Sequence, residues 1–322
     1  MRIAIIGAGI SGLTLARKLS ETHDVEIFEK ARGVGGRMST RRVDDLRYNH
    51  GCQLFTAHSD QFQGFCTQMI NQGVIKKFSG KVINMQNSQA KEMKSNKVYY
   101  LSYPYMNSLC KHLVKNLQIH LNTRITNITR SHHKWVLKSE DQTFRDFDIL
   151  LITIPSPQVS DLLPKTFQYL PQIKQIHMSP CFALILRFNK NLAMNYSVAN
   201  IVDSPIKAIF VNNLQSNSVE SPTTIVSHAT STWSTQNIDC NQAEIANTLQ
   251  QALQRFIHFK KTDIQYFVVH LWRYARATEH HRCTSFFDDT LQIGICGDWL
   301  ASGDIEGGYL SALDLYEKTH TI

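Results

Sequence analysis

The stretch Ile3-Ala-Ile-Ile-Gly-Ala-Gly-Ile-Ser-Gly12 joins a short apolar run to a glycine-rich loop. In residues 13–19 the apolar side chains fall at helical spacing, and residues 25–28 alternate as a second strand would. Together these segments predict a β-α-β unit of about thirty residues, the size at which dinucleotide-binding domains begin. The fold class that follows is α/β, with a Rossmann-type nucleotide-binding domain.

Each glycine of the Gly7-x-Gly9-x-x-Gly12 loop has a predicted task. Gly7 makes the tight turn, Gly9 lets a pyrophosphate approach the backbone, and Gly12 allows the helix to pack closely. The helix amino terminus offers free N–H groups and a partial positive charge to phosphates. Glu29, at the end of the second strand, is placed to accept hydrogen bonds from the adenosine ribose.

NAD and FAD both use such a unit, and three later segments favour FAD. The first is Arg32-Gly-Val-Gly-Gly-Arg37, whose glycines and arginine extend the anion site and place a guanidinium on the pyrophosphate. The second is Gly297-Asp298, where the carboxylate is expected to hold a ribitol hydroxyl. The third is Gly303-Asp-Ile-Glu-Gly-Gly308 before the last helix. The amino-terminal dipole of that helix would stabilise negative charge at the pyrimidine end of a reduced flavin.

Composition excludes several classes of protein. The 322 residues are 43% apolar and 19% charged, which is typical of a globular chain, and no apolar run is long enough to span a membrane. The net charge of +8 is spread over the sequence, which argues against a nucleic-acid groove and leaves an anionic small substrate as the alternative.

Seven cysteines without a C-x-x-C pair argue against disulfides and structural zinc. The pairs His132-His133 and His280-His281 lack a third partner at metal-ligand spacing, so we expect no metal site. The apolar run begins at Ile3 with no cleavable signal region before it. A reducing, cytoplasmic setting is expected.

From about residue 156 the pattern changes to longer strands rich in β-branched and aromatic residues. We therefore predict a second, substrate domain of antiparallel sheet plus helices, inserted into the first. The predicted FAD-binding domain comprises residues 1–55, 101–155 and 285–322, and the substrate domain comprises 56–100 and 156–284.

The order of these pieces resembles that of the flavin-containing amine oxidases, and more closely that of the renalase family. The matching stretches span nearly the whole chain: residues 29–42, His50-Gly-Cys-Gln-Leu-Phe-Thr56, Tyr103-Pro-Tyr-Met-Asn107, Trp233-Ser234, His270-Leu-Trp-Arg-Tyr-Ala275 and Gly297-Asp-Trp-Leu300. The resemblance implies a fold of the p-hydroxybenzoate hydroxylase and amine oxidase type, with further FAD contacts at Ser11, Gln53, Leu54 and Ile125.

With the resemblance included, the residues expected to hold FAD are Gly7, Gly9, Ser11, Gly12, Glu29, Lys30, Gly36, Arg37, Gln53, Leu54, Ile125, Asp298 and Gly308. The chain departs from the family pattern at Cys52, where alanine is common, and at Leu54, where an aromatic residue is common. The segment that tethers the flavin in monoamine oxidases is absent from the sequence, so the FAD is expected to be noncovalent.

Family members take hydride from the 2- and 6-dihydro isomers of NAD(P)H and pass the electrons to O2, giving NAD(P)⁺ and H2O2. By resemblance, this chain is expected to do the same, as a monomer or weak dimer. The expected pocket walls are His270, Trp272, Tyr274 and Trp233, although packing along strands explains such aromatics equally well. The alternatives are an amine oxidase or desaturase, a hydroxylase that consumes NADPH, and a non-catalytic FAD-binding redox protein.

Overall fold

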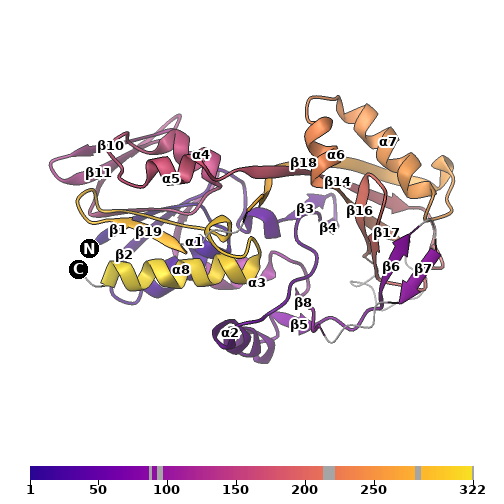
Figure 1. Cartoon of the computed structure of the whole chain (residues 1–322). Helices are drawn as coiled ribbons and strands as arrows, with labels where there is room; N and C mark the ends of the chain where they lie inside the picture. Colours follow the sequence, from indigo (N-terminus) through magenta and orange to yellow (C-terminus); the bar gives the residue numbers. More distant parts are fainter. Residues whose placement is uncertain (87–88, 93–96, 213–221, 280–283, 321–322) are drawn as a thin grey trace.

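The computed structural model describes residues 1–86, 89–92, 97–212, 222–279 and 284–320. The pair His280-His281 therefore lies outside the described residues. Two sheets organise the chain, and they lie at opposite ends of an elongated molecule (Figure 1). Among the described residues, no helix combines the length and apolar character needed to cross a bilayer.

The first sheet has six strands in the order β19-β20-β13-β1-β2-β9. All neighbours are parallel except β19 and β20, which are antiparallel. Its strands are β1 (Arg2–Ile6), β2 (Asp24–Phe28), β9 (Gln118–His120), β13 (Ile149–Ile152), β19 (Ser285–Asp288) and β20 (Ile293–Cys296). The inner strands are mostly apolar because helices or a second layer cover both faces of the sheet.

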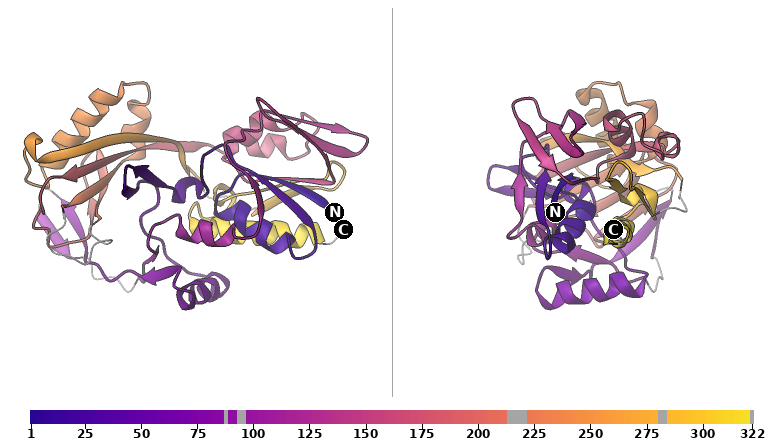
Figure 2. Two further views of the ribbon diagram at one scale, coloured as in Figure 1. Left: turned by 180° about the vertical axis from the view of Figure 1, so that it is seen from behind. Right: turned by 90° about the vertical axis from the view of Figure 1, so that its left-hand side faces the viewer.

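One face of this sheet packs against helices α1 (Ile10–Leu19), α3 (Ser108–Leu113) and α8 (Ile305–His320). In Figure 2 these helices lie together beneath the strands. The other face is covered by a three-stranded meander and two short helices: β10 (Asn127–Ser131), β11 (Lys134–Lys138), β12 (Thr143–Phe147), α4 (Ser156–Leu162) and α5 (Leu170–Lys174). The last strand, β20, returns from the far end of the chain to lie beside β13.

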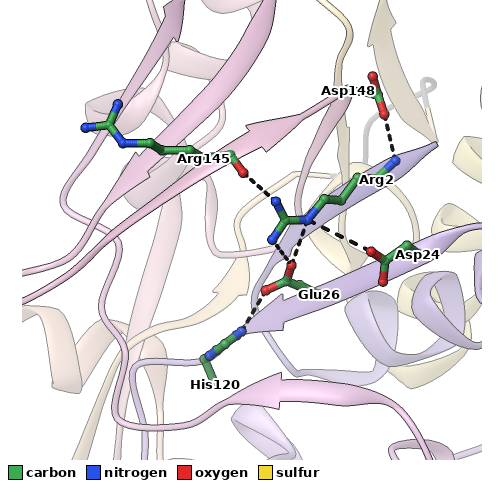
Figure 3. Close-up of polar contacts among 6 residues, drawn as sticks. All are labelled: Arg2, Asp24, Glu26, His120, Arg145 and Asp148. Atoms are coloured by element: carbon green, nitrogen blue, oxygen red, sulfur yellow. Dashed lines mark hydrogen bonds and ion pairs between the residues drawn. The ribbon is translucent and has the colours of Figure 1, made fainter.

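A polar network around Arg2 and the buried carboxylate of Glu26 links this sheet to the meander (Figure 3). Glu26, in β2, accepts hydrogen bonds from the Arg2 guanidinium and lies 2.8 Å from the His120 ring nitrogen. Arg2 also donates to the carbonyl of Arg145, and its backbone N–H donates to Asp148. Because each oxygen of the buried carboxylate has a partner, the desolvation cost of the charge is offset.

The second sheet has seven strands in the order β18-β14-β17-β16-β15-β6-β7. They are antiparallel neighbours apart from the parallel pair β15 and β6. The strands are β6 (Val82–Gln86), β7 (Gln89–Glu92), β14 (Met178–Phe188), β15 (Val198–Ile201), β16 (Ile206–Val211), β17 (Thr224–Ala229) and β18 (Ile264–Ala277). The long strands β14 and β18 run from the second sheet back towards the first (Figure 1).

The two faces of the second sheet differ. One face packs against α6 (Ser231–Gln236) and α7 (Gln242–Gln254) in an apolar core. The short helix η2 (Lys261–Asp263) follows α7 in the chain. The other face meets the hairpin of β3 (Thr40–Val43) and β4 (Leu46–Asn49) through a small cluster around Tyr48, Ile185 and Val226. We call this second face the hairpin face. It faces the space between the two sheets in Figure 1.

The predicted domain boundaries shift at two places. Helix α2 (Asp60–Asn71) buries Phe62, Cys66 and Met69 in the core of the first sheet, so it packs with the FAD-binding domain. Helices α4 and α5 also pack there, although residues after 156 were assigned to the substrate domain. The remaining elements are β5 (Ile75–Lys77), β8 (Tyr100–Ser102), η1 (Gly36–Met38) and η3 (Asp298–Leu300).

Candidate active site

The glycine loop lies at the carboxyl end of β1, where α1 begins. Gly7 has φ +108°, a conformation that favours glycine, and a Cβ on Gly12 would lie 2.0 Å from the Gly7 carbonyl oxygen. A Cβ on Gly9 would meet nothing within 4 Å. The turn and the close packing therefore have the geometry predicted for Gly7 and Gly12, and open space lies in front of Gly9.

The first turn of α1 is open to an anion. Gly9 is the residue before the helix, and because it has no side chain it does not cap the first N–H groups. A Cβ on Gly36 would lie 3.6 Å from the Gly9 Cα, so the second glycine segment borders the same space. Ser11 is buried, and a Cβ on Gly308, in α8, would lie 3.0 Å from its hydroxyl oxygen. The predicted contacts from both ends of the chain thus meet at the start of α1.

Glu29 follows β2 and is buried. Its Oε2 accepts a hydrogen bond from the Ala8 N–H (2.9 Å), and its Oε1 accepts one from the Ala31 N–H (2.8 Å). These bonds fix the carboxylate beside the glycine loop, with lone pairs left over for ribose hydroxyls. The neighbouring Lys30 is exposed. The Thr123 N–H donates to the Glu29 carbonyl, which brings the segment leading to the buried Ile125 alongside.

Arg37 and Asp298 come together although 261 residues separate them. The guanidinium donates to both carboxylate oxygens and also to the Ala275 carbonyl (3.0 Å). The sequence assigned Arg37 to the pyrophosphate and Asp298 to the ribitol chain. In the structure the two side chains form a bidentate ion pair beside the glycine loop.

The segment after β4 carries Gln53 and Leu54. Gln53 is buried; its amide donates to the carbonyls of Asn49 (2.8 Å) and Gly51 (3.2 Å), and its oxygen accepts from Asn212 (3.3 Å). The Leu54 carbonyl accepts from the thiol of Cys52 (3.2 Å). Burial raises the pKa of Cys52 to about 12, so this thiol stays protonated and is not a nucleophile.

His270 and Trp272 meet His50 on the hairpin face. The ring centroids are 4.7 Å apart for His50 and His270, 5.0 Å for His50 and Trp272, and 4.4 Å for His270 and Trp272. The Trp272 indole N–H donates to the His50 carbonyl (3.0 Å). His228 lies 3.3 Å from the same carbonyl through its Nε2. We call these four residues the histidine–tryptophan cluster.

Strand register explains how the cluster forms. Ala183 of β14 lies opposite both His228 of β17 and His270 of β18, so the three side chains share one face of the sheet. The small side chain of Ala183 leaves room between the two imidazoles. Among the described residues, no three His, Cys, Asp or Glu side chains are arranged to hold a metal ion.

The cluster is electrically neutral at physiological pH. Burial, reinforced by His270 and Arg41, lowers the pKa of His50 to about 3. Burial lowers the pKa of His228 to about 4, and burial followed by Arg41 lowers the pKa of His270. Three imidazoles beside an indole therefore form a polar but uncharged wall.

The structure does not bring the other two predicted wall residues into this cluster. Trp233, on α6, packs edge-on against Phe182 (5.9 Å between centroids), and both belong to the core on the opposite face of the sheet. Tyr274 is half-buried on β18, past the irregular pairing of that strand with β14. His50, His228 and Arg41 were missed as site residues. Of these three, only His228 had a signal in the sequence, because strand alternation predicts which face of the sheet a residue occupies.

The sequence predicts that the amino-terminal dipole of α8 stabilises negative charge on a reduced flavin, but a carboxylate of the chain itself lies at that end. The Asp304 carboxylate accepts from the Gly307 N–H (2.8 Å), so a negative group already caps the first turn. Glu306 is buried and accepts from the N–H groups of His58 (2.8 Å) and Ser59 (2.7 Å), just before α2. The amino end of α8 therefore also holds the segment that follows the Gln53 loop.

These residues fit FAD. The open space at Gly9 leaves the backbone free to meet a pyrophosphate, and the held carboxylate of Glu29 suits a ribose. FAD bound here would run from Glu29 past Gly9 to Arg37 and Asp298, and we call this expected path the flavin groove. The Gln53 loop connects this groove to the histidine–tryptophan cluster through the carbonyl of His50. FAD bound along this path would have its adenosine end at Glu29.

Comparisons with known proteins identify the family to which the chain belongs. Residues 5–69 match an NAD(P)-binding Rossmann-like domain. The chain is 22% identical to renalase of Mus musculus over 303 residues, which cover 86% of this chain and 85% of that protein. A further match, 46% over 52 residues, is to 4,4'-diapophytoene desaturase of Staphylococcus aureus and covers 16% of this chain and 10% of that protein.

Solved structures share the fold. A redesigned double mutant of putrescine oxidase superposes with a TM-score of 0.77 at 11% identity, covering 100% of both chains. Cyclohexylamine oxidase of Brevibacterium oxydans gives 0.74 at 10% identity, covering 99% of both. Residues 71–314, most of the chain, match the family described as flavin containing amine oxidoreductase. The chain therefore belongs to the flavin containing amine oxidoreductase family and is an FAD-dependent oxidoreductase.

Proposed function

We propose that the chain is an oxidase of renalase type, which takes hydride from 2- or 6-dihydro isomers of NAD(P)H. The products are NAD(P)⁺ and, after two electrons and two protons reach O2, H2O2. The observation that carries this proposal is the uncharged wall of His50, His270 and Trp272, which the Gln53 loop joins to the residues expected to hold FAD. The similarity to mouse renalase over 86% of the chain supports it.

The chemistry of the substrate matches such a wall. Loss of hydride turns a dihydronicotinamide into an aromatic pyridinium, so the step needs no general base. The ring becomes cationic as it reacts, and protonated histidines beside it would oppose that charge. Neutral imidazoles avoid this repulsion, and the face of Trp272 favours a nearby cation.

FAD supplies the hydride acceptor and the route to O2, and we propose that it is held noncovalently. The task of this chain is to orient the dihydronicotinamide ring and exclude other poses. His50 and Trp272 are fixed for that purpose by the hydrogen bond from the indole to the His50 carbonyl. The buried Gln53 holds the loop that joins this wall to the cofactor groove.

Oxidation of an amine is the second candidate, because the family and two fold neighbours are amine oxidases by description. A cationic amine substrate is commonly matched by a carboxylate. In the described residues, the charged or titratable groups that shift the pKa values of His50 and His270 are Arg41 and other histidines, with no acid among them. That arrangement favours the dihydronicotinamide.

Anaerobic reduction of the yellow holoenzyme tests the proposal. Flavin absorbance near 450 nm is followed after mixing with 6-dihydro-NAD, with 2-dihydro-NAD, with ordinary NADH, and with a panel of primary amines. We expect rapid bleaching by the two isomers and none by the amines, then recovery in air with one H2O2 per isomer oxidised. Bleaching by amines alone would assign the chain to amine oxidation.

A further inference from the structure

We propose that Arg41 binds the phosphate next to the nicotinamide riboside of the substrate, so that the site selects nucleotides over uncharged ring compounds. This inference rests on the function proposed above. It assigns a phosphate subsite to the β3–β4 hairpin, which packs on the hairpin face of the second sheet.

The register of the hairpin places Arg41. Arg41 pairs with Tyr48, so both side chains project from the same face of the two strands. Tyr48 is buried against the hairpin face of the large sheet and stacks on Tyr266 (5.9 Å between centroids). The Arg41 side chain therefore leaves the hairpin toward the sheet that carries the histidine–tryptophan cluster. Its positive charge lies near enough to lower the pKa values of His50 and His270.

The side chain of the half-buried Arg41 has an unpartnered polar atom. Its Nε is buried without a hydrogen-bond partner, and in the described ranges no carboxylate lies within ion-pair distance of it. Arg2 and Arg37, by contrast, are paired with Glu26 and Asp298. A buried N–H of a charged group without an acceptor is costly, so the site is poised to take an anion.

His50, whose pKa is lowered by burial and also by the charge of Arg41, supplies a second unsatisfied atom. The residue is 6% exposed, and its Nδ1 has no hydrogen-bond partner. The neutral imidazole can donate one hydrogen bond without adding charge beside the reacting ring. A guanidinium and a neutral imidazole are together suited to a phosphate, since the planar donor fork of arginine matches two phosphate oxygens.

We assign the anion to a phosphate rather than to a carboxylate on the ring. His50 is in contact with both His270 and Trp272, which are the proposed ring wall, and Arg41 acts on the same two histidines. The anion must then lie next to the ring rather than at the far end of the molecule. In a nicotinamide nucleotide, that anion is the 5′-phosphate, which the mononucleotide and the dinucleotide share.

The test compares two substrates that differ only in that phosphate. Holoenzyme is reduced anaerobically with the 6-dihydro forms of nicotinamide mononucleotide and nicotinamide riboside, and the substrate Kd is taken from the bleaching rates. For Arg41→Gln we expect the mononucleotide Kd to rise about 10- to 100-fold. The riboside Kd should stay within about twofold, and Arg41→Lys should recover part of the loss because it keeps the charge without the fork.

Arg42→Gln is the matched control. Arg42 is the next residue of β3, is exposed, and projects from the other face of the hairpin opposite Arg47. We expect both Kd values to be unchanged in this variant. An equal loss for both substrates in Arg41→Gln would show a merely structural role, and a loss of FAD content would place Arg41 in the cofactor site. Either result overturns the proposal.

A binding measurement separates this subsite from the reaction. Oxidised wild-type holoenzyme and the Arg41→Gln variant are titrated calorimetrically with inorganic pyrophosphate. We expect saturable binding that weakens at least about tenfold in the variant. If no dihydronicotinamide bleaches the wild type, the proposed function fails; selective loss of pyrophosphate binding would still support the subsite. Equal pyrophosphate binding by the two proteins would overturn the subsite whatever the substrate is.

Discussion

His50 carries much of the electrostatic character of the site. The side chain is 6% exposed, its backbone carbonyl accepts the indole N–H of Trp272, and its ring contacts His270. Burial keeps the imidazole neutral far below the pH at which an exposed histidine would charge. A residue that must stay neutral in the folded chain also makes stability depend on pH.

The sign of that dependence can be worked out. The folded pKa of His50 is about 3, below its ordinary value of 6.5, so the unfolded chain takes up the proton first as the pH falls. The contribution to stability is complete above pH 6.5 and is lost progressively on acidification towards pH 3. Each such histidine adds a slope of about 1.4 kcal/mol per pH unit within this window.

His50→Asn should therefore lose less stability on acidification than the wild type. Urea unfolding at pH 6.5, 5.5 and 4.5 is expected to show a slope smaller by about 1.4 kcal/mol per pH unit in the variant. His132→Asn, at an exposed position with φ +49°, should keep the wild-type slope. Identical slopes in wild type and His50→Asn would mean that His50 titrates normally in the folded chain.

Two glycines of the first loop should respond differently to one added methyl group: Gly12 mainly in stability and Gly9 mainly in FAD affinity. In Gly12→Ala the Cβ would lie 2.0 Å from the Gly7 carbonyl oxygen, so backbone must move, and we expect a loss of at least about 3 kcal/mol in stability. In Gly9→Ala the methyl enters open space, so the apoprotein should lose about 1 kcal/mol or less. Its FAD affinity should nevertheless fall at least about tenfold.

Two measurements separate these outcomes. Urea unfolding of the apoproteins reports packing, and fluorescence quenching during FAD titration reports the cofactor site. Gly64→Ala, in α2 with nothing near the added Cβ, serves as the control for a glycine substitution in open space. Unchanged FAD affinity in Gly9→Ala would place the pyrophosphate elsewhere.

At the scale of elements, the sequence predicted most of the regular segments that have strong apolar patterns. The β-α-β start and the long strands after residue 156, which include β14 and β18, occur where the pattern predicts them. The hairpin of β3 and β4 was not predicted because its strands, Thr40–Val43 and Leu46–Asn49, are short and mostly polar.

Because the hairpin was not predicted, part of the site was not predicted either. Arg41 and His50 reach the histidine–tryptophan cluster only because the hairpin packs on the large sheet. His228 joins through the register of β17 with β14, a pairing between residues distant in sequence. Motif spacing identifies residues that bind within one β-α-β unit. It carries no information on which strands lie opposite each other across a second sheet.

The contact between α8 and α2 offers a prediction at this scale. Both oxygens of the buried Glu306 accept backbone N–H bonds from His58 and Ser59. In Glu306→Gln an amide nitrogen would face one of those donors, which should cost about 1–3 kcal/mol. Urea midpoints would report the loss, and Glu317→Gln, exposed on the same helix, should leave the midpoint unchanged. Equal midpoints for the two variants would mean that this contact does not stabilise the chain.

For the whole molecule, the cofactor groove joins segments from both ends of the chain. Arg37 pairs with Asp298, 261 residues away, and Gly308 of α8 lies against Ser11 of α1. A ligand that contacts both ends binds the native fold and has no comparable site in the unfolded chain. FAD should therefore stabilise the entire first sheet rather than one loop.

Thermal unfolding of the deflavinated protein should thus depend on added FAD. At a free FAD concentration one hundred times Kd, the gain is about 2.7 kcal/mol, and the Tm should continue to rise with concentration. Riboflavin is the matched control, because it lacks the pyrophosphate and adenosine that the Gly9 space and Glu29 would bind. We expect it to shift the Tm much less.

Flavin should also appear in the supernatant after acid precipitation, because we propose noncovalent binding. Flavin retained on the precipitated chain, or a Tm indifferent to FAD, would contradict a reversible ligand that bridges the two ends of the sequence.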